Sequence, residues 1–337
     1  MRLPDHHHPP QLAHSVLDLI GQTPLIELHR VVNQANLQGR LLAKCEMNNP
    51  GLSKKDRIAY WMIQEARSHG QLVPGQTVIE MTSGNTGTGL ALVCAALGHP
   101  FVAVMSRGNT PERAAHMSAL GARVVLVDQG RESIPGQVSG EDLKRVEAEA
   151  DRLTLELKAF RPSQFSNHAN ILAHETTTGP EIWWQAGGNI DVFVDCAGTA
   201  GTFTGVARYL KSQNPKIRCY LVEPENAAIL SLANPQDSQK LTGSHKIQGA
   251  GYLRPEADLP LFDNSCVDGF LTVSDKEAIE ATRILARTEG LLGGFSSGAH
   301  LAAAMKLLET TESGKTIVFL VCDSGLKYLS TDLFAVQ

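Results

Sequence analysis

The 337-residue chain has no apolar run long enough to cross a membrane, no closely spaced cysteines and no excess of basic residues. A membrane-spanning helix needs about 20 consecutive apolar residues, and no run here approaches that length. The formal net charge of −5 at pH 7 argues against nucleic acid or an anionic membrane surface, since both attract basic patches. We therefore expect neither class of partner.

The six cysteines stand at positions 45, 94, 196, 219, 266 and 322. Zinc sites usually draw their ligands in closely spaced pairs, so we expect no metal. Several of these cysteines lie inside apolar runs, which predicts buried, reduced thiols. The first 14 residues are rich in proline and histidine and contain no apolar signal-peptide stretch, which favours a cytoplasmic protein. We expect residues 1–11 and 333–337 to be flexible.

What the sequence does contain is an alternation of short apolar stretches with segments of helical spacing. The expected strands are 77–81, 101–105, 123–127, 191–196, 216–222 and 316–321. The expected helices are 57–68, 87–97, 111–120, 140–158, 203–213, 275–289 and 297–309. Near-continuous apolar strands between helices are typical of a parallel sheet covered on both faces. The sequence thus predicts an α/β protein with two doubly wound domains, each built on a central, mostly parallel sheet.

The first candidate for chemistry is a lysine at the start of a helix. Lys55 opens the expected helix, and the partial positive charge of the helix N-terminus favours the neutral amine that forms an imine with an aldehyde. Burial in a cleft would act in the same direction. Lys54 has the same merits, and these arguments do not separate the two. The plain alternative is a surface lysine.

Two loops rich in glycine and hydroxyl groups lead from expected strands into expected helices, at residues 82–87 and 198–202. Such a helix start offers free N–H groups to an anion, and ligands of doubly wound sheets bind at the carboxyl ends of strands. In the second loop Thr199 and Thr202 add donors, and in the first Asn85 adds an amide. A lysine with two anion sites is what a pyridoxal phosphate enzyme acting on an amino acid requires. Simple capped turns are the alternative for each loop.

A third motif, Gly294-Phe295-Ser296-Ser297-Gly298, matches the nucleophile pattern of hydrolases. That pattern requires a preceding strand, whereas residues 275–289 have helical spacing. The last histidine of the chain, His300, also follows Ser296 too closely for a triad. A hydroxyl that meets a ring nitrogen, or a helix cap, is the better interpretation of Ser296.

These segments resemble the fold type II pyridoxal phosphate enzymes, in particular the cysteine synthase (O-acetylserine sulfhydrylase) and cystathionine β-synthase group. The resemblance extends over most of the chain. It is carried by residues 20–25 (IGQTPL), 82–87 (TSGNTG), 175–183 (ETTTGPEIW), 245–251 (HKIQGAG) and 328–331 (YLST).

The resemblance implies roles by position. The family motif ends in Ser-x-Lys-Asp-Arg, which selects Lys55 over Lys54 for the Schiff base. The other implied cofactor contacts are Asn85 at the phenolic oxygen, Gly198, Thr199, Ala200, Gly201 and Thr202 at the phosphate, and Ser296 at the pyridine nitrogen. The implied substrate contacts are Thr82, Ser83, Asn85, Thr86 and Gln164 at the carboxylate, and Gly249 on the side of the nucleophile.

The resemblance also implies a domain organisation and an assembly. Residues 48–160 would form a smaller, mobile domain that binds the substrate carboxylate. Residues 12–47 and 161–332 would form a larger domain that binds the cofactor. A homodimer is implied, and docking of a serine acetyltransferase tail in the active site is a further expectation.

The implied reaction is β-replacement on an activated serine through an aminoacrylate, with Lys55 as the general base. Formation of cysteine from O-acetyl-L-serine and sulfide is the leading expectation. Ala200 stands where the family usually has glycine, and Cys322-Asp323-Ser324-Gly325-Leu326-Lys327-Tyr328 replaces Pro-x-Ser-Gly-Glu-Arg-Tyr. These departures leave room for a different acceptor, as in cystathionine synthesis. A catalytically silent regulatory homologue is the alternative from another class.

Overall fold

The computed structural model describes residues 12–130, 140–232, 235–251 and 259–334. Of the segments predicted to be flexible, 1–11 and 335–337 lie outside this part. The prediction is wrong for Leu333, which is fully buried in a 3-10 helix at Asp332–Phe334. Leu333 packs with Phe295 and Tyr328, so the last described turn belongs to the core.

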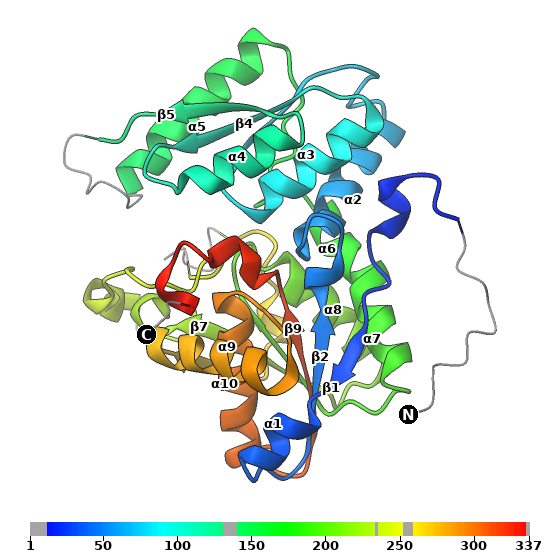
Figure 1. Cartoon of the computed structure of the whole chain (residues 1–337), viewed down its shortest axis with the longest axis vertical. Coiled ribbons are helices and arrows are strands. Elements are labelled where there is room, and N and C mark those ends of the chain that lie inside the picture. Colours follow the sequence, from blue (N-terminus) through cyan, green and yellow to red (C-terminus); the bar gives the residue numbers. More distant parts are fainter. Residues whose placement is uncertain (1–11, 131–139, 233–234, 252–258, 335–337) are drawn as a thin grey trace.

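The chain folds around two sheets, which Figure 1 shows one above the other. The smaller sheet has the order β3-β4-β5 and is parallel throughout. The larger has the order β1-β2-β9-β6-β7-β8 and is parallel except for the edge pair β1–β2. The strands are β1 (Leu25–Glu27), β2 (Arg40–Cys45), β3 (Val78–Met81), β4 (Phe101–Ser106), β5 (Arg123–Val127), β6 (Val192–Cys196), β7 (Arg218–Pro224), β8 (Gly269–Val273) and β9 (Thr316–Val321).

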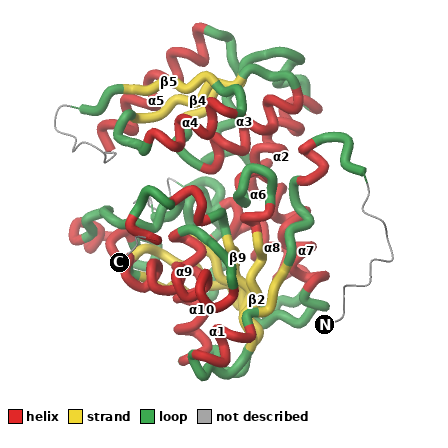
Figure 2. The backbone as a smooth tube through the Cα atoms, viewed as in Figure 1, coloured by secondary structure: helices red, strands yellow, loops and turns green. Residues whose placement is uncertain are grey.

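Helices cover both faces of each sheet, as Figure 2 shows by element type. On the larger sheet, successive residues of one strand enter opposite cores: Val192 packs on the side of α9 and α10, whereas Phe193 packs on the side of α8. This two-sided burial explains why the strands are continuously apolar. The helices are α1 (His29–Gln34), α2 (Lys55–Ser68), α3 (Asn85–Leu97), α4 (Pro111–Ala119), α5 (Gly140–Glu156), α6 (Ala169–Ala173), α7 (Gly179–Gln185), α8 (Gly201–Gln213), α9 (Asp275–Glu289) and α10 (Phe295–Glu309), with a π-helix, η3, at His174–Thr178.

The predicted α/β class is confirmed, and each expected strand and helix is present to within two residues at its ends. Strands β1, β2 and β8 were not predicted. β1 and β8 are half-exposed edge strands with weak apolar patterns, and β2 contains the fully buried Lys44. Among the described residues no helix is long and apolar enough to cross a membrane.

The arrow of β2 in Figure 1 points towards the smaller sheet, so the carboxyl ends of the parallel strands of the larger sheet face that unit. Four helices start two residues earlier than predicted, at Lys55, Asn85, Gly201 and Phe295. Four of the predicted site residues, Lys55, Asn85, Gly201 and Ser296, therefore lie in the first turns of helices, where N–H groups are free.

Candidate active site

A pocket opens where the two units meet and collects residues from six separate segments. It is lined by Lys54, Lys55, Asn85, Cys196, Gln248, Gly249, Ser296 and Cys322. Four of the predicted site residues are thus brought together: Lys55, Asn85, Gly249 and Ser296. Lys54, Cys196 and Cys322 were not predicted to line this pocket.

The two neighbouring lysines differ in their partners. The ammonium of Lys54 lies 2.9 Å from Asp195 Oδ1 and 3.3 Å from Oδ2, whereas no described residue bonds to the side-chain nitrogen of Lys55. Burial and then the charge of Lys54 lower the pKa of Lys55 to about 8. Burial also acts to lower the pKa of Lys54, but the Asp195 carboxylate outweighs it and holds that pKa above the ordinary value. The geometry therefore distinguishes two lysines that the residue arguments left equivalent: Lys54 is paired with a carboxylate, whereas the amine of Lys55 has no bonded partner among the described residues.

The 198–202 loop joins β6 to α8. Ala200 is the N-cap of α8 with a φ of +65°, a left-handed conformation that favours glycine, so the methyl group is accommodated with strain. Asn170 donates from Nδ2 to Thr199 Oγ1 at 3.0 Å, while its buried Oδ1 has no partner among the described residues. A Cβ on Gly201 would collide with that oxygen. The loop is therefore a close-fitting cradle of N–H and hydroxyl donors.

A histidine that the sequence analysis missed supports the same loop. His174 is fully buried and places Nε2 3.1 Å from Thr202 Oγ1 and Nδ1 2.9 Å from Thr178 Oγ1. Burial holds the pKa of His174 well below its usual range, so the ring is neutral, with one donor and one acceptor nitrogen. Its position just before the 175–183 segment was the only signal that could have drawn attention to it.

The 82–87 loop joins β3 to α3, and its side chains bond to segments outside the smaller sheet. Asn85 donates from Nδ2 to Asp323 Oδ2 at 2.7 Å and accepts from Lys327 Nζ at 2.7 Å. Thr86 donates to Gln164 Oε1 at 2.6 Å, which joins two of the residues predicted to bind the substrate carboxylate. Asn85 retains a second amide hydrogen.

The other two predicted carboxylate contacts are placed in the same loop by their backbones. Thr82 is buried, and its N–H donates to Val104 O at 3.1 Å. The carbonyl oxygen of Ser83 accepts from Arg113 at 3.2 Å. Among the described residues, neither side chain is hydrogen-bonded to a residue that lines the pocket, so their predicted role stays a prediction.

Ser296 and Gly249 complete the pocket wall. Ser296 lies in the first turn of α10, which follows the helix α9 and not a strand, so the hydrolase pattern lacks its structural context. Gly249 has a φ of +92° and a Cβ there would meet nothing within 4 Å, so its backbone conformation is what calls for glycine.

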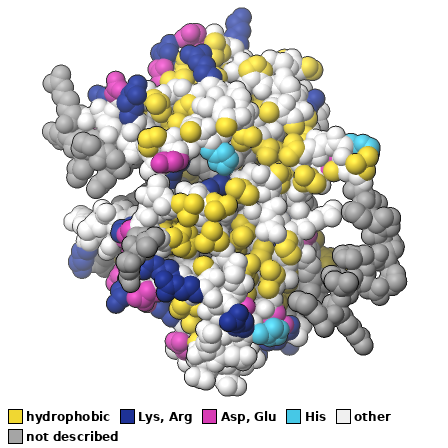
Figure 3. Space-filling model, viewed as in Figure 1, with side chains coloured by type: hydrophobic (Ala, Val, Ile, Leu, Met, Phe, Trp, Pro, Cys, Tyr) yellow, Lys and Arg dark blue, Asp and Glu magenta, His cyan; other side chains and the backbone are white. Residues whose placement is uncertain are grey.

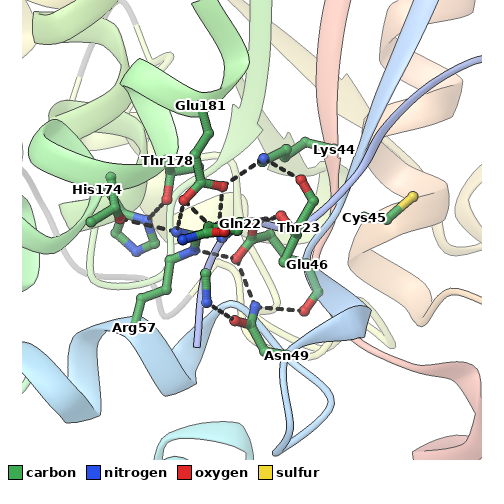
Figure 4. A network of polar contacts seen from close by, with 12 residues as sticks. Gln22, Thr23, Lys44, Cys45, Glu46, Asn49, Arg57, His174, Thr178 and Glu181 are labelled. Carbon is green, nitrogen blue, oxygen red and sulfur yellow. Dashed lines mark hydrogen bonds and ion pairs between the residues drawn. The ribbon is translucent and has the colours of Figure 1, made fainter. Parts of the chain in front are cut away.

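A buried ion network anchors the start of α2 (Figure 4). Arg57 donates to both oxygens of Glu46, at 2.7 Å each, and to both oxygens of Glu181, at 2.7 and 2.8 Å. Lys44 donates to Glu181 at 2.7 Å and to the carbonyl oxygen of Thr23 at 2.6 Å. Two cations thus face two carboxylates with their hydrogen bonds made, which is the condition under which buried ions are tolerated.

The pKa of Glu46 reflects this balance. Burial alone would raise the pKa of Glu46, but Arg57 lowers it to about 2, so the carboxyl stays ionised. Because Arg57 is two residues after Lys55, the network fixes the turn that carries the reactive amine. No local charge pattern in the sequence predicts this network.

The six cysteines are all buried and free, as predicted. One of them, Cys322, lies with Asp195 and His300 in a group whose ligand atoms are within 4.8 Å of one another. His300 accepts from the Cys196 N–H at 2.8 Å through Nε2 and contacts Leu320 O at 2.9 Å through Nδ1. Its ring nitrogens are thus engaged with the backbone, and we assign no metal to this group.

Comparison with known proteins agrees with this arrangement. A family model described as pyridoxal-phosphate dependent enzyme matches residues 16–323. Cysteine synthase A of Escherichia coli (strain K12) is 41% identical over 321 residues, covering 94% of both chains. Among solved structures, cysteine synthase of Entamoeba histolytica matches with a TM-score of 0.88 at 32% identity, over 100% of this chain and 95% of that one. O-ureido-L-serine synthase matches with a TM-score of 0.85 at 36% identity, over 96% of both chains.

Proposed function

Because the chain belongs to the family of pyridoxal-phosphate dependent enzymes, we propose that it is a cysteine synthase that converts O-acetyl-L-serine and sulfide into L-cysteine and acetate. The observation that carries the proposal is the amine of Lys55, which faces the pocket without a bonded partner and has a pKa of about 8. An amine that is partly neutral near pH 7.5 is suited both to imine formation and to proton abstraction.

The residues present fit the cofactor, pyridoxal 5′-phosphate. The free N–H groups at the start of α8, together with the hydroxyl groups of Thr199 and Thr202, leave a cradle for a phosphate in the 198–202 loop. Asn85 would donate its second amide hydrogen to the phenolic oxygen, and Ser296 would face the pyridine nitrogen. When bound, the cofactor supplies the electron sink that makes the substrate Cα acidic.

The substrate is placed and deprotonated by this chain's own groups. Its carboxylate would bind at the 82–87 loop with Gln164, opposite the N–H groups that open α3. Lys55 would take the proton from Cα, and the β-leaving group would depart towards the Gly249 side. Closure of the smaller domain over the substrate, which would exclude water, stays a prediction of the sequence analysis.

A different acceptor is the second candidate, and one observation favours it. Lys327, which stands where the family pattern has arginine, is directly bonded to Asn85 at the pocket, and so is Asp323 of the same segment. One of the similar solved structures is named O-ureido-L-serine synthase rather than cysteine synthase. Cystathionine formation from homocysteine belongs to the same class of alternatives. The reactive state of Lys55 argues against a catalytically silent homologue.

The test is a visible spectrum of the purified holoprotein, titrated in turn with O-acetyl-L-serine, O-phospho-L-serine and L-serine, followed by product analysis with sulfide and with homocysteine. We expect O-acetyl-L-serine to bleach the resting band and sulfide to restore it with release of cysteine. Lys55→Ala is the control that should show neither change. A holoprotein that gives no spectral change with any donor would contradict the proposal.

We further propose a homodimer, as the resemblance implies, that acts in the cytoplasm, where the six free, buried thiols would stay reduced. Hydrophobic side chains gather across the middle of the face in Figure 3, and Leu326 and Leu329 are 58% and 60% exposed. Docking of a serine acetyltransferase tail stays a prediction from the resemblance.

A further inference from the structure

The pocket contains two lysine side chains but only one carboxylate within bonding distance of either. Lys54 and Lys55 are consecutive and both line the pocket. Asp195, at the end of β6, is fully buried and contacts Lys54 through both oxygens, at 2.9 and 3.3 Å. The side chain of Lys54 is 11% exposed, so water screens this pair little.

The other titratable groups near the two amines offer no second negative charge. These groups are Cys196, Cys322, His174, His300 and Arg57. Burial raises the pKa of Cys322 to about 12 and also raises that of Cys196, so both thiols stay protonated. His174 is neutral, His300 accepts a backbone N–H, and the charge of Arg57 is matched by Glu46 and Glu181.

Two ammonium groups in a pocket of low dielectric repel each other strongly, and one buried carboxylate can balance only one of them. We propose that Asp195 fixes the positive charge on Lys54, and that this fixed ammonium disfavours protonation of Lys55, so that part of Lys55 is a neutral amine near neutral pH. Lys54 and Asp195 are then positioning residues for the reaction rather than catalytic ones. The inference deepens the proposed function, on which it rests for the role of Lys55.

The arrangement has a consequence for proton transfer. A proton that Lys55 accepts from Cα makes Lys55 a second ammonium beside Lys54. This second ammonium has no counterion of its own. That proton is therefore held weakly and is readily passed on to the departing group. In the resting protein the same repulsion favours the amine that can form an imine.

The experiment measures the protonation of Lys55 without relying on turnover. The full-length protein, freed of cofactor, is labelled with trinitrobenzenesulfonate over a range of pH, and labelling of the peptide containing residues 54 and 55 is followed by mass spectrometry. In the unchanged protein we expect the midpoint for Lys55 near pH 8 and little labelling of Lys54.

Four variants give different signatures. Lys54→Met leaves Asp195 to pair with Lys55, so the midpoint for Lys55 should rise by about two units and labelling at pH 8 should fall about 50-fold. Asp195→Asn should instead make Lys54 reactive at pH 8. Lys54→Arg keeps the cation and should keep the midpoint for Lys55. Lys306→Met, which removes a surface lysine paired with Glu277, is the matched control and should change nothing.

The inference is overturned if the midpoint for Lys55 in Lys54→Met stays within about 0.3 units of its original value. Burial alone would then explain the neutral amine. If Lys54→Met does not fold by circular dichroism, the double variant Lys54→Met/Asp195→Leu removes the pair without a buried lone charge. Raised labelling of Lys55 at pH 7 in that variant would equally contradict the inference, since loss of the cation should never ease deprotonation.

Failure of the proposed function has a different signature. The holoprotein could give no cysteine from O-acetyl-L-serine while its labelling midpoints shift as expected. That result would support the charge arrangement and contradict the assigned reaction. In an active enzyme Lys55 is a free amine only after the substrate has displaced it from the cofactor, so the acid limb of the pH profile of kcat should move upwards in Lys54→Met by the same two units as the labelling midpoint.

Discussion

The 198–202 loop and the 82–87 loop share a sequence signature, yet the structure supports them in different ways. The first is braced by Asn170 and His174, which lie buried beside it on α6 and η3. The second is braced by Asp323 and Lys327, from the segment that follows β9 in the larger sheet, and by Gln164. One loop is fixed within its own unit, whereas the other is held by bonds across the pocket. A loop fixed within its own unit suits a ligand that stays bound, such as the cofactor. A loop held across the pocket suits a ligand that comes and goes, such as the substrate.

Gly201→Ala tests the fixed loop and should have the largest effect. The added Cβ collides with Asn170, which is buried and cannot move freely. Overpacking of this kind costs about 1–3 kcal/mol, so affinity for pyridoxal phosphate should fall about 10- to 100-fold in a fluorescence titration. Gly84→Ala in the other loop is the control, because a Cβ there meets nothing within 4 Å. Equal losses in the two variants would remove the distinction between the loops.

The strands that lead into the two loops each end with a buried carboxyl group, and these should differ in their response to pH. Asp195 is paired with Lys54, whereas burial raises the pKa of Glu80 to about 7, against the opposing charge of Arg161. A folded pKa above the unfolded value of about 4.5 means that stability is greatest below pH 4.5 and is lost as the pH rises through 7.

Glu80→Gln should therefore stabilise the protein at pH 8 by about 1–3 kcal/mol and change little at pH 5. Urea unfolding of both proteins at the two pH values measures the difference. The surface substitution Glu149→Gln serves as a control for general charge effects. A difference between Glu80→Gln and the unchanged protein that is the same at pH 5 and pH 8 would contradict the raised pKa.

The bond between Thr86 and Gln164 tests the loop held across the pocket. Thr86→Ala and Gln164→Ala should each raise the KM for O-acetyl-L-serine about 5- to 10-fold while leaving cofactor affinity unchanged, since a hydrogen bond contributes about 1 kcal/mol. The double variant should lose less than the product of the single losses, because the two side chains are bonded to each other. If the variants lose affinity for the cofactor instead, Thr86 and Gln164 serve the cofactor rather than the substrate, which would contradict the prediction.

Ala200→Gly should have the smallest effect. Glycine relieves the cost of a φ of +65°, but it also gives the unfolded chain more freedom, so the net gain in the free energy of unfolding should be below about 1 kcal/mol. Cofactor affinity should not change, since no N–H donor is added or lost. Thermal unfolding measures the gain. A destabilised Ala200→Gly protein would show that the methyl group packs favourably in the cradle.

The sequence predicts the parts of this molecule that depend on local patterns. Apolar strands, helix starts and the two loops follow from spacing alone, and Ser274 caps α9 through a capping box as its sequence indicates. Leu333 was misplaced because a short apolar turn near the end of the chain has no periodicity to mark its burial.

The supports of the site depend on contacts between residues far apart in the chain. Lys54 pairs with a residue 141 positions away and Asn85 with one 238 positions away. No local pattern indicates that Asp195 will accept from Lys54 rather than Lys55, because the choice is made by how β6 lies against the start of α2. The identity of the reactive lysine was therefore available from family resemblance and from the structure, but not from the physics of the sequence.

The ion network at Arg57 has a mechanical consequence. The body of α2 packs with α3 under the smaller sheet, whereas its first turn is tied to Glu46, the residue after β2, and to Glu181 on α7 of the larger unit. A rotation of the smaller unit would therefore pivot about that turn, and the amine two residues before Arg57 would stay near the axis. If the smaller unit does close over the pocket, Lys55 would keep its place while the entrance changes shape.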